Sequence, residues 1–239
     1  MHLYRWFPPL CSWPMLSIVI PTLNAERVLG ATLEALVPGA LSGLVSQLVI
    51  SDGGSDDATI AIADAAGADV VTGAAGRGGQ LARGADAARG KWLLFLHADT
   101  VLAPNWPEQV RRFIDEGDEA RAASFRYRLD DRRMRARIVE KVVALRCLVA
   151  VLPYGDQGLL VSRRLYDELG GYGNLVLMED VDLVRRIGRH RLELLDHDAV
   201  TSAERYVRGG YLRCTMRNLG CLGLWYAGMA PERIAGIYR

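Results

Sequence analysis

The chain has 239 residues, half of them hydrophobic and 24% charged, which is enough for one large or two small globular domains. Lys and Arg number 29 and Asp and Glu number 28, and this near-neutral balance argues against a nucleic-acid partner. No apolar run reaches the roughly 20 residues of a membrane-spanning helix. The four cysteines show no paired spacing, so we expect reduced thiols in a cytoplasmic protein.

The first 15 residues differ from the rest of the chain. They contain aromatic residues and prolines but no continuous apolar stretch, so they do not resemble a signal peptide. We expect this segment to be disordered or to precede the true start, at about Met15. Residues 16–239 are interpreted as one domain.

Strands and helices are predicted to alternate in the first half of the chain. This order indicates an α/β fold with a parallel sheet. Asn24 is expected to cap the first helix, and Ser55 or Asp56 the second. The predicted strands cover residues 16–20, 44–50, 69–72 and 92–96, and the predicted helices cover 24–37, 55–66 and 80–88.

The second half has a different pattern. A surface helix at 105–116, a helix after Ser162 and a helix starting near Glu179 are predicted, with strands at 122–129, 159–161 and 192–195. Apolar residues at helical spacing between Asp130 and Leu152 indicate an ordinary packed helix, but a basic, apolar helix also suits a membrane surface. The aromatic stretch from Gly209 leaves the same two alternatives open.

Polar residues follow three predicted strands, at 21–26, 52–57 and 97–99. Ligand sites in open α/β sheets lie beyond the carboxyl ends of the strands, so one site is expected there. A carboxylate such as Asp99 can hold a divalent cation that binds a diphosphate, or it can simply cap a turn. A dinucleotide-dependent dehydrogenase fits poorly, because the glycine-rich segment at 76–79 does not follow the first strand.

Two carboxylates, Glu179 and Asp180, lie at a predicted helix N-terminus. They either complement the helix dipole or provide a base at the mouth of a cleft. Asp156 and Gln157 lie in a loop between two glycines.

Five segments of the chain form an ordered set: 17–24, 52–59, 95–100, 154–158 and 178–183. They occur in the order seen in the family 2 glycosyltransferases, and the chain resembles this family from about Leu16 to its end. The most similar branch is the small bacterial one described as radical-SAM/selenodomain-associated glycosyltransferases. The resemblance implies a GT-A fold, in which residues 16–103 form a Rossmann-like nucleotide-sugar-binding half, 104–205 an acceptor and catalytic half, and 206–239 C-terminal amphipathic helices.

The resemblance also implies roles for individual residues. Asp180 matches the catalytic base, with Glu179 beside it, Asp99 matches the metal-binding carboxylate, and Asp52 matches the residue that reads the nucleobase. The other residues expected to bind the nucleotide sugar are Pro21, Thr22, Asn24, Glu26, Arg77, Gln80, Arg83, His97 and Ala98.

Asp156 and Gln157 match the loop on the acceptor side of the family's site. Two positions depart from the family pattern. His97 stands at the first position of the DxD motif, which leaves metal ligation to Asp99 and the phosphates. Ala82 stands where asparagine is usual, which puts one donor contact in doubt.

The leading hypothesis is an inverting glycosyltransferase that uses Mg²⁺ or Mn²⁺ and a UDP- or GDP-linked sugar. The cation on Asp99 would stabilise the departing diphosphate, with help from Arg77 or Arg83. Asp180 would take the proton from an acceptor hydroxyl or carboxyl group.

Two alternatives stay open: a catalytically silent module that binds a nucleotide sugar, and a nucleotidyltransferase that releases pyrophosphate. The acceptor is not identified by the motifs. The basic helix and the aromatic C-terminus suit a lipid such as a carotenoid or polyisoprenoid, which implies a cytoplasmic protein in peripheral contact with the inner membrane face.

Overall fold

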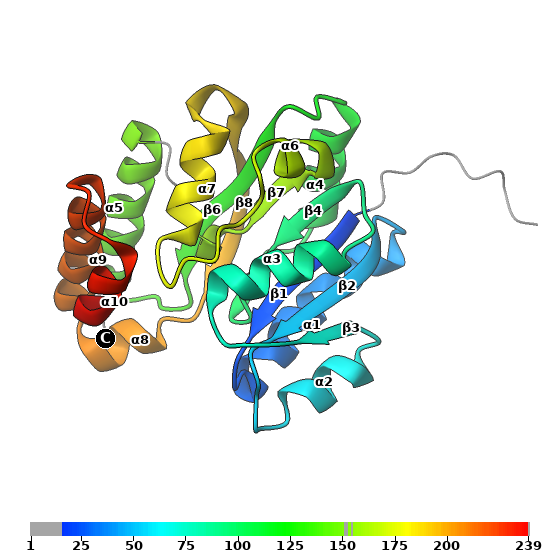
Figure 1. The fold of residues 1–239 in the computed structure, drawn as a ribbon, viewed down its shortest axis with the longest axis horizontal. Coiled ribbons are helices and arrows are strands. Elements are labelled where there is room, and N and C mark those ends of the chain that lie inside the picture. The colour runs from blue at the N-terminus through cyan, green and yellow to red at the C-terminus, as the bar shows by residue number, and fades with distance from the viewer. Residues whose placement is uncertain (1–15, 151–152, 154, 239) are drawn as a thin grey trace, which may run out of the picture.

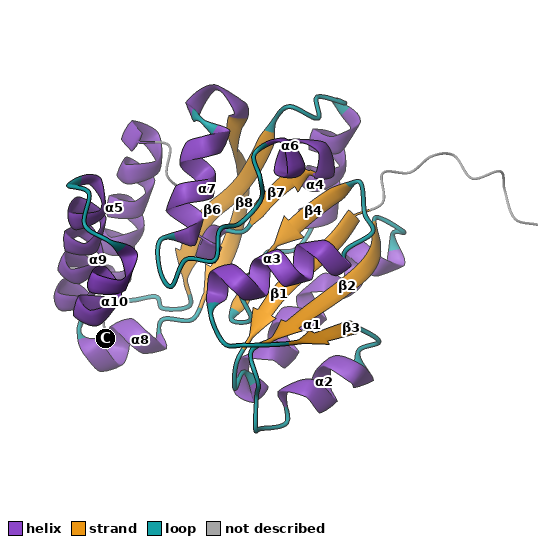
Figure 2. Cartoon of the chain, viewed as in Figure 1, coloured by secondary structure: helices purple, strands orange, loops and turns teal. Residues whose placement is uncertain are grey.

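The computed structural model describes residues 16–150, 153 and 155–238, so the predictions for residues 1–15 fall outside it. A mixed sheet of eight strands runs through the described part (Figures 1 and 2). The strands are β1 (Leu16–Thr22), β2 (Val45–Asp52), β3 (Asp69–Thr72), β4 (Trp92–Phe95), β5 (Thr100–Leu102), β6 (Ala122–Leu129), β7 (Leu159–Ser162) and β8 (Leu192–Thr201).

Helices cover both faces of the sheet (Figure 2). Those in the first half are α1 (Glu26–Leu41), α2 (Thr59–Ala65), α3 (Arg77–Ala87) and α4 (Trp106–Asp115). Those in the second half are α5 (Met134–Ala150), α6 (Arg163–Glu168), α7 (Glu179–Ile187), α8 (Glu204–Gly209), α9 (Tyr211–Tyr226) and α10 (Pro231–Tyr238), with 3₁₀ turns η1 (Gly155–Gln157) and η2 (Arg189–Arg191).

The strand order is β3-β2-β1-β4-β7-β6-β8-β5. The four strands from β3 to β4 are parallel, as the sequence predicts, and their carboxyl ends therefore lie at one edge. β7 pairs with β4 in the antiparallel direction and begins the second half of the sheet. This change of direction is where the two halves of the chain meet.

The core has one apolar cluster on each face of the sheet. α1, α2 and α4 contribute to the first, which contains Ile18 and Ile20, and α3, α6 and α7 contribute to the second, which contains Val19. Burial on both faces explains the continuous apolar strands in the sequence. A third cluster, around Tyr127, joins the end of β6 to α5, α8 and α9.

The predicted end of the first helix is wrong. α1 continues through Pro38 to Leu41, and Gly39 is inside it. A Cβ at Gly39 would lie 2.4 Å from the Trp106 ring, so this glycine permits the close packing of α4 and does not end the helix. The Trp106 indole donates a hydrogen bond to the carbonyl of Ala35 at 2.9 Å.

The predicted N-caps of the first two helices are also wrong. Asn24 has a positive φ of 50°, and its side chain accepts a hydrogen bond from the Asp56 N–H at 3.0 Å. α1 starts at Glu26, with Ala25 and not Asn24 at its N-cap position, and α2 starts only at Thr59. The Ser55 hydroxyl accepts a hydrogen bond from the Asn24 N–H at 2.8 Å. The Asn24 and Ser55 side chains therefore link the loops after β1 and β2, a tertiary contact that local pattern does not reveal.

Other elements agree with the prediction more closely. Ser162 caps α6 by accepting a hydrogen bond from the Leu165 N–H. α3 begins at Arg77, three residues before its predicted start, and β8 extends to Thr201 because it pairs with both β6 and β5. β5 was not predicted. In the described residues no helix combines the length and the apolar character that crossing a membrane requires.

Candidate active site

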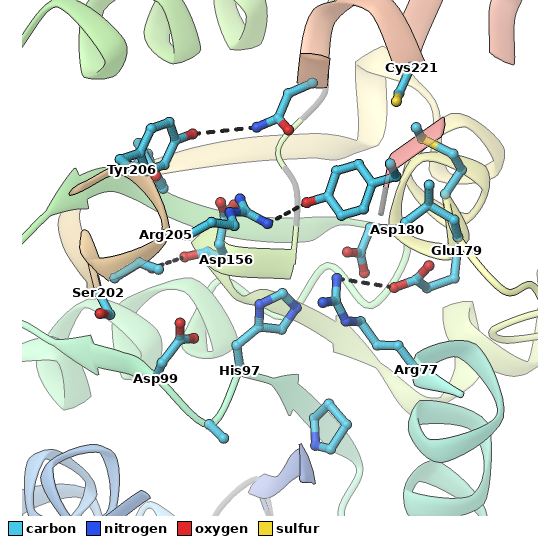
Figure 3. A pocket seen from close by; sticks show the side chains of 18 of the residues that line it. Arg77, His97, Asp99, Asp156, Glu179, Asp180, Ser202, Arg205, Tyr206 and Cys221 are labelled. Carbon is cyan, nitrogen blue, oxygen red and sulfur yellow. Dashed lines mark hydrogen bonds and ion pairs between the residues drawn. The ribbon is translucent and has the colours of Figure 1, made fainter. Parts of the chain in front are cut away.

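A cavity of about 650 Å³ lies at the carboxyl ends of β1 and β4, and Figure 3 shows side chains around it. One side comes from these strand ends, from η1 and from the first turns of α3 and α7, and the other from α5, α8, α9 and α10. The structure therefore brings most of the predicted residues together. Those in the lining are Pro21, Thr22, Asn24, Arg77, Gln80, His97, Ala98, Asp99, Asp156, Glu179 and Asp180.

Four predicted residues do not line the cavity: Glu26, Asp52, Arg83 and Gln157. Glu26 accepts a hydrogen bond at 3.2 Å from the backbone N–H just before α2. Arg83 donates to the carbonyl of Asp52 at 2.9 Å. The Gln157 amide donates to a β6 carbonyl at 2.9 Å. These side chains hold the loops that shape the cavity.

Asp52 is fully buried at the end of β2 and organises the loop that follows. Its carboxylate accepts hydrogen bonds from the Thr22 hydroxyl at 2.8 Å, from the Gly54 N–H at 2.8 Å and from the Ser55 N–H and hydroxyl at 2.7 and 2.6 Å. Burial alone would raise the pKa of Asp52, but these hydrogen bonds outweigh burial and lower it. The ionised carboxylate is therefore stabilised by its own loop.

Gln80 links the same loops from the first turn of α3. Its amide donates hydrogen bonds to the carbonyls of Thr22 at 2.7 Å and Ser51 at 2.9 Å. The Gly76 N–H donates to its side-chain oxygen at 3.2 Å. Gln80 is 5% exposed, so it positions the glycine-rich loop from inside the fold.

Asp180 lies in the first turn of α7, and its carboxylate reaches the cavity. One oxygen accepts a hydrogen bond from the Gly155 N–H at 3.0 Å, and the other accepts one from the Tyr172 hydroxyl at 3.4 Å. Burial raises the pKa of Asp180, opposed by Arg77 and by the Gly155 N–H. The carboxylate is thus held in position with a stronger affinity for protons than an exposed aspartate has.

Gly155 allows three segments to meet closely. A Cβ at this position would lie 2.5 Å from His97 Nε2 and 2.6 Å from Asp180 Oδ2. Only a residue without a side chain fits between these two groups. η1 therefore connects the DxD-like segment after β4 to the base candidate on α7, a contact that the sequence did not reveal.

Glu179 is 2% exposed and lies 3.5 Å from Arg77 of α3. Burial raises the pKa of Glu179 to about 7, and the neighbouring Asp180 carboxylate adds to this rise, while Arg77 opposes it. The ion pair joins the two halves of the chain across the cavity. It also keeps a positive charge beside Asp180.

Glu179→Gln is expected to raise the free energy of unfolding by about 1–3 kcal/mol at about pH 8. The pKa of Glu179 is about 7 in the folded protein, above its ordinary value of 4.5, so ionisation of this carboxyl costs stability as the pH rises through this range. Below about pH 4.5 the carboxyl is protonated in both states, and the gain should disappear. Chemical unfolding at the two pH values measures it. Glu34→Gln, at an exposed position of α1, is the matched control, and an equal gain for both variants would contradict this account.

His97 and Asp99 are the candidates for a metal site. His97 Nε2 is buried without a hydrogen-bond partner among the described residues. Burial, together with the positive charges of Arg77 and Arg205, lowers the pKa of His97 well below its ordinary value, so its ring is neutral and can act as a ligand. No group of three or more His, Cys, Asp or Glu in the described part could hold a metal. A metal bound by His97 and Asp99 would therefore need further ligands, such as the phosphate oxygens of a bound nucleotide.

The far wall of the cavity comes from residues that the sequence analysis did not select. Arg205 of α8 hydrogen-bonds to the Tyr238 hydroxyl of α10, and its guanidinium lies 5.7 Å from the Tyr206 ring and 5.8 Å from the Tyr238 ring (Figure 3). The apolar part of this wall consists of Val139, Val142, Val143 and Leu219. The alternation of Arg and Tyr residues near the C-terminus was the feature of the sequence that could have indicated this wall.

Asp156 lies between the two walls. One of its carboxylate oxygens is buried without a hydrogen-bond partner among the described residues. Burial raises the pKa of Asp156 to about 6, with contributions from Asp180 and Asp99 and opposition from Arg146. A buried carboxylate whose oxygen is unpartnered is suited to accept a hydrogen bond from a bound hydroxyl group.

Comparison with known proteins identifies the family. Residues 17–161, more than half of the chain, match the model for Glycosyl transferase family 2. The chain belongs to glycosyl transferase family 2. The matched region contains β1 to β7, including Asp52, Asp99 and Asp156, and stops before α7.

Curated relatives match a limited stretch of this family 2 chain. A PGL/p-HBAD biosynthesis glycosyltransferase of Mycobacterium tuberculosis is 38% identical over 96 residues, which is 37% of this chain and 37% of that protein. A glucosyl-3-phosphoglycerate synthase of Mycolicibacterium smegmatis is 37% identical over 94 residues, which is 36% of this chain and 31% of that protein. The match therefore spans about a third of each relative's length.

Solved structures match nearly the whole chain and show a GT-A fold. The glucosyl-3-phosphoglycerate synthase of Mycobacterium tuberculosis, in complex with Mn²⁺ and UDP-glucose, has a TM-score of 0.64 and 22% identity, covering 90% of this chain and 80% of that one. Staphylococcus aureus TarS has a TM-score of 0.61 and 17% identity, covering 93% of this chain and 42% of the other. The arrangement predicted from the sequence is confirmed at the level of the fold.

Proposed function

We propose that this protein is an inverting, metal-dependent glycosyltransferase that moves a sugar from a UDP- or GDP-linked donor to an acceptor hydroxyl or carboxyl group. The observation that carries this proposal is the position of Asp180. Its buried carboxylate faces a cavity with the polar strand ends on one side and an apolar, aromatic wall on the other. One carboxylate thus lies where a donor and an acceptor would meet.

The donor would bind along residues 16–103. Pro21, Thr22 and Asn24 line the cavity at the end of β1, and Arg77 brings a positive charge suited to a diphosphate. Asp52 is fully buried and engaged with its own loop, so we propose that it acts on the nucleobase site by holding that loop.

Ala82, the departure from the family pattern, packs against the core and does not line the cavity. An asparagine at this position would therefore not belong to the cavity wall. This supports an active enzyme over a silent module. His97 at the first DxD position supports assignment to the radical-SAM-associated branch.

A divalent cation, Mg²⁺ or Mn²⁺, fits the donor set if the diphosphate supplies most of the ligands. Asp99 offers a carboxylate, and His97 offers a neutral ring nitrogen that no other described group occupies. The structural relative in complex with Mn²⁺ and UDP-glucose supports the choice of metal. A bound cation supplies charge stabilisation for the departing diphosphate.

Residues of this chain would accept the proton of the acceptor group and orient the carboxylate that takes it. The Gly155 N–H and the Tyr172 hydroxyl orient the Asp180 carboxylate, and burial raises its proton affinity. Asp180 takes the proton from the acceptor group as that oxygen attacks the anomeric carbon in line with the leaving diphosphate, which inverts the carbon. Asp156 would accept a hydrogen bond from the acceptor, and residues 104–205 would bind the acceptor.

The acceptor is proposed to be a lipid, such as a carotenoid or polyisoprenoid. Val139, Val142, Val143 and Leu219 give the acceptor wall an apolar surface, and Tyr206 adds an aromatic ring. Apolar and aromatic linings with few polar groups are typical of sites for apolar ligands. Peripheral contact with a membrane is part of this proposal, because such an acceptor resides in a bilayer.

A donor screen tests the proposal. UDP- and GDP-sugars are added with and without Mn²⁺ to the wild-type protein and to Asp99→Ala, and the thermal unfolding midpoint is measured. One donor should raise the midpoint only with metal and only when Asp99 is present, since a ligand at 100 times its Kd adds about 2.7 kcal/mol of stability. Asp115→Ala, at the end of α4, is the control. No shift with any donor would support the silent module instead.

A further inference from the structure

A second hollow, of about 480 Å³, lies beside the active-site cavity between α8 and α9. Four arginines line it, Arg205, Arg208, Arg213 and Arg217, together with a single acidic side chain, Glu204. Glu204 is paired with Arg208, so one carboxylate faces four guanidinium groups. The proposed sugar transfer does not use this hollow, although Glu204 and Arg205 line both spaces.

Exposed apolar side chains occur on the two long helices of the same region. On α5 they are Met134 (74% exposed), Ile138 (56%), Leu145 (59%) and Leu148 (71%). Their spacing places them on one face, which also contains Lys141. The opposite face of α5 carries Val139 and Val143, which line the cavity.

α9 also has an exposed apolar face, formed by residues at helical spacing. Leu212 (77% exposed), Met216 (59%), Leu219 (40%) and Tyr226 (52%) share one face. Leu219 also lines the active-site cavity, so the exposed face of α9 continues to its rim. α5, α8, α9 and α10 gather at one end of the molecule, away from β3 (Figure 1).

The charges of this end indicate what covers it. α9 contains two arginines and no acidic residue. Among the described residues, no carboxylate lies within ion-pair distance of Arg135, Lys141 or Arg213, while the Glu140 carboxylate of α5 is buried against Arg128 and Arg137. A second copy of the chain would bring like charges together. A surface of phosphate groups over hydrocarbon matches both the arginines and the apolar side chains.

We propose that the α8–α9 hollow binds the phosphate headgroup of an anionic phospholipid, with the exposed apolar faces of α5 and α9 lying in the interface of that bilayer. Arginine suits phosphate recognition because its planar guanidinium group forms paired hydrogen bonds. Phospholipid binding does not require that the protein transfers sugar. One implication does rest on the proposed function: binding to the bilayer would place the apolar wall of the cavity beside the lipid from which an acceptor would enter.

The test is sedimentation of the full-length protein with phospholipid vesicles. One set is pure phosphatidylcholine, and the other also contains phosphatidylglycerol, which carries a net negative charge. The wild-type protein should bind the second set and not the first. The double variant Arg208→Gln/Arg213→Gln should bind it at least about tenfold more weakly. The variant Arg112→Gln/Arg164→Gln removes the same charge from exposed positions on α4 and α6, and it should bind as the wild type does.

A second variant tests the apolar faces. Leu145→Gln/Met216→Gln changes two exposed side chains, so the fold should be retained, and vesicle binding should again fall. Equal binding to both sets of vesicles, equal loss in the α4/α6 control, or no binding by the wild type would overturn the proposal. So would stabilisation by inorganic phosphate without vesicle binding, since the hollow would then be a site for a free anion.

The nucleotide-sugar thermal shift, measured on the same variants, should equal that of the wild type. This measurement distinguishes failure of the phospholipid proposal from failure of the proposed enzyme activity.

Discussion

Asp180→Asn is expected to reduce sugar transfer by about 10²–10⁴-fold while the protein stays folded and still binds its donor. Asparagine has almost the same shape as aspartate and can still accept the hydrogen bond from the Gly155 N–H. It cannot take a proton from the acceptor. The turnover number should therefore fall, with little change in the concentration of donor needed for half-saturation.

The measurement is initial rate against donor concentration for the wild type and two variants. Asp182→Asn is the matched control, because Asp182 lies on the same helix but pairs with Arg186 outside the cavity lining. Its rate should stay near that of the wild type. A fully active Asp180→Asn protein would place the base elsewhere, and Glu179 or Asp156 would be the next residue to change.

Asp52→Ala is expected to lower the free energy of unfolding by about 3 kcal/mol at neutral pH. The substitution leaves the Thr22 hydroxyl, the Gly54 N–H and the Ser55 N–H without their acceptor in a buried loop. Each unsatisfied buried donor costs about 1–3 kcal/mol, reduced where the loop relaxes to reach water. Donor binding should weaken too, because Thr22, which lines the cavity, loses the hydrogen bond that its hydroxyl donates to Asp52.

The pH dependence of Asp52→Ala gives a further check. The pKa of Asp52 is lowered in the folded protein, so its contribution to stability is fully present above the unfolded pKa, near 3.8, and is lost as the pH falls through the folded value. The difference between wild type and variant should therefore shrink in acid. Urea unfolding at several pH values measures it. Asp56→Ala, at an exposed position in the same loop, is the control, and an equal loss there would show that Asp52 has no special role.

Local sequence was sufficient to predict the cavity wall at the ends of β1 and β4, where we propose that the donor binds. β1 and β4 are apolar runs followed by polar residues, and the carboxyl ends of parallel strands lie at one edge of the sheet. That rule alone brings Thr22 and Asp99 to one cavity. The position of Asp180 followed from the start of α7 together with the family resemblance.

The cavity wall formed by α5, α8, α9 and α10 could not be predicted in this way. It depends on how these helices pack against one another, and no local pattern specifies that packing. In the sequence Arg205 looks like an ordinary surface arginine, and its hydrogen bond to Tyr238 depends on the position of α10 in the fold. Gly155 resembled a loop glycine, although its lack of a side chain lets His97 and Asp180 approach the same backbone.

The ion pair between Arg77 and Glu179 would link the proposed donor binding to protonation of Glu179. Arg77 opposes the rise in the pKa of Glu179, so any anion that draws Arg77 away raises that pKa further. A diphosphate arriving near α3 would then be accompanied by proton uptake on α7 near neutral pH. By thermodynamic linkage, donor affinity would increase as the pH falls toward 7, whereas the base needs a higher pH to be ionised. The two requirements oppose each other, and we expect the pH optimum for turnover to lie between them.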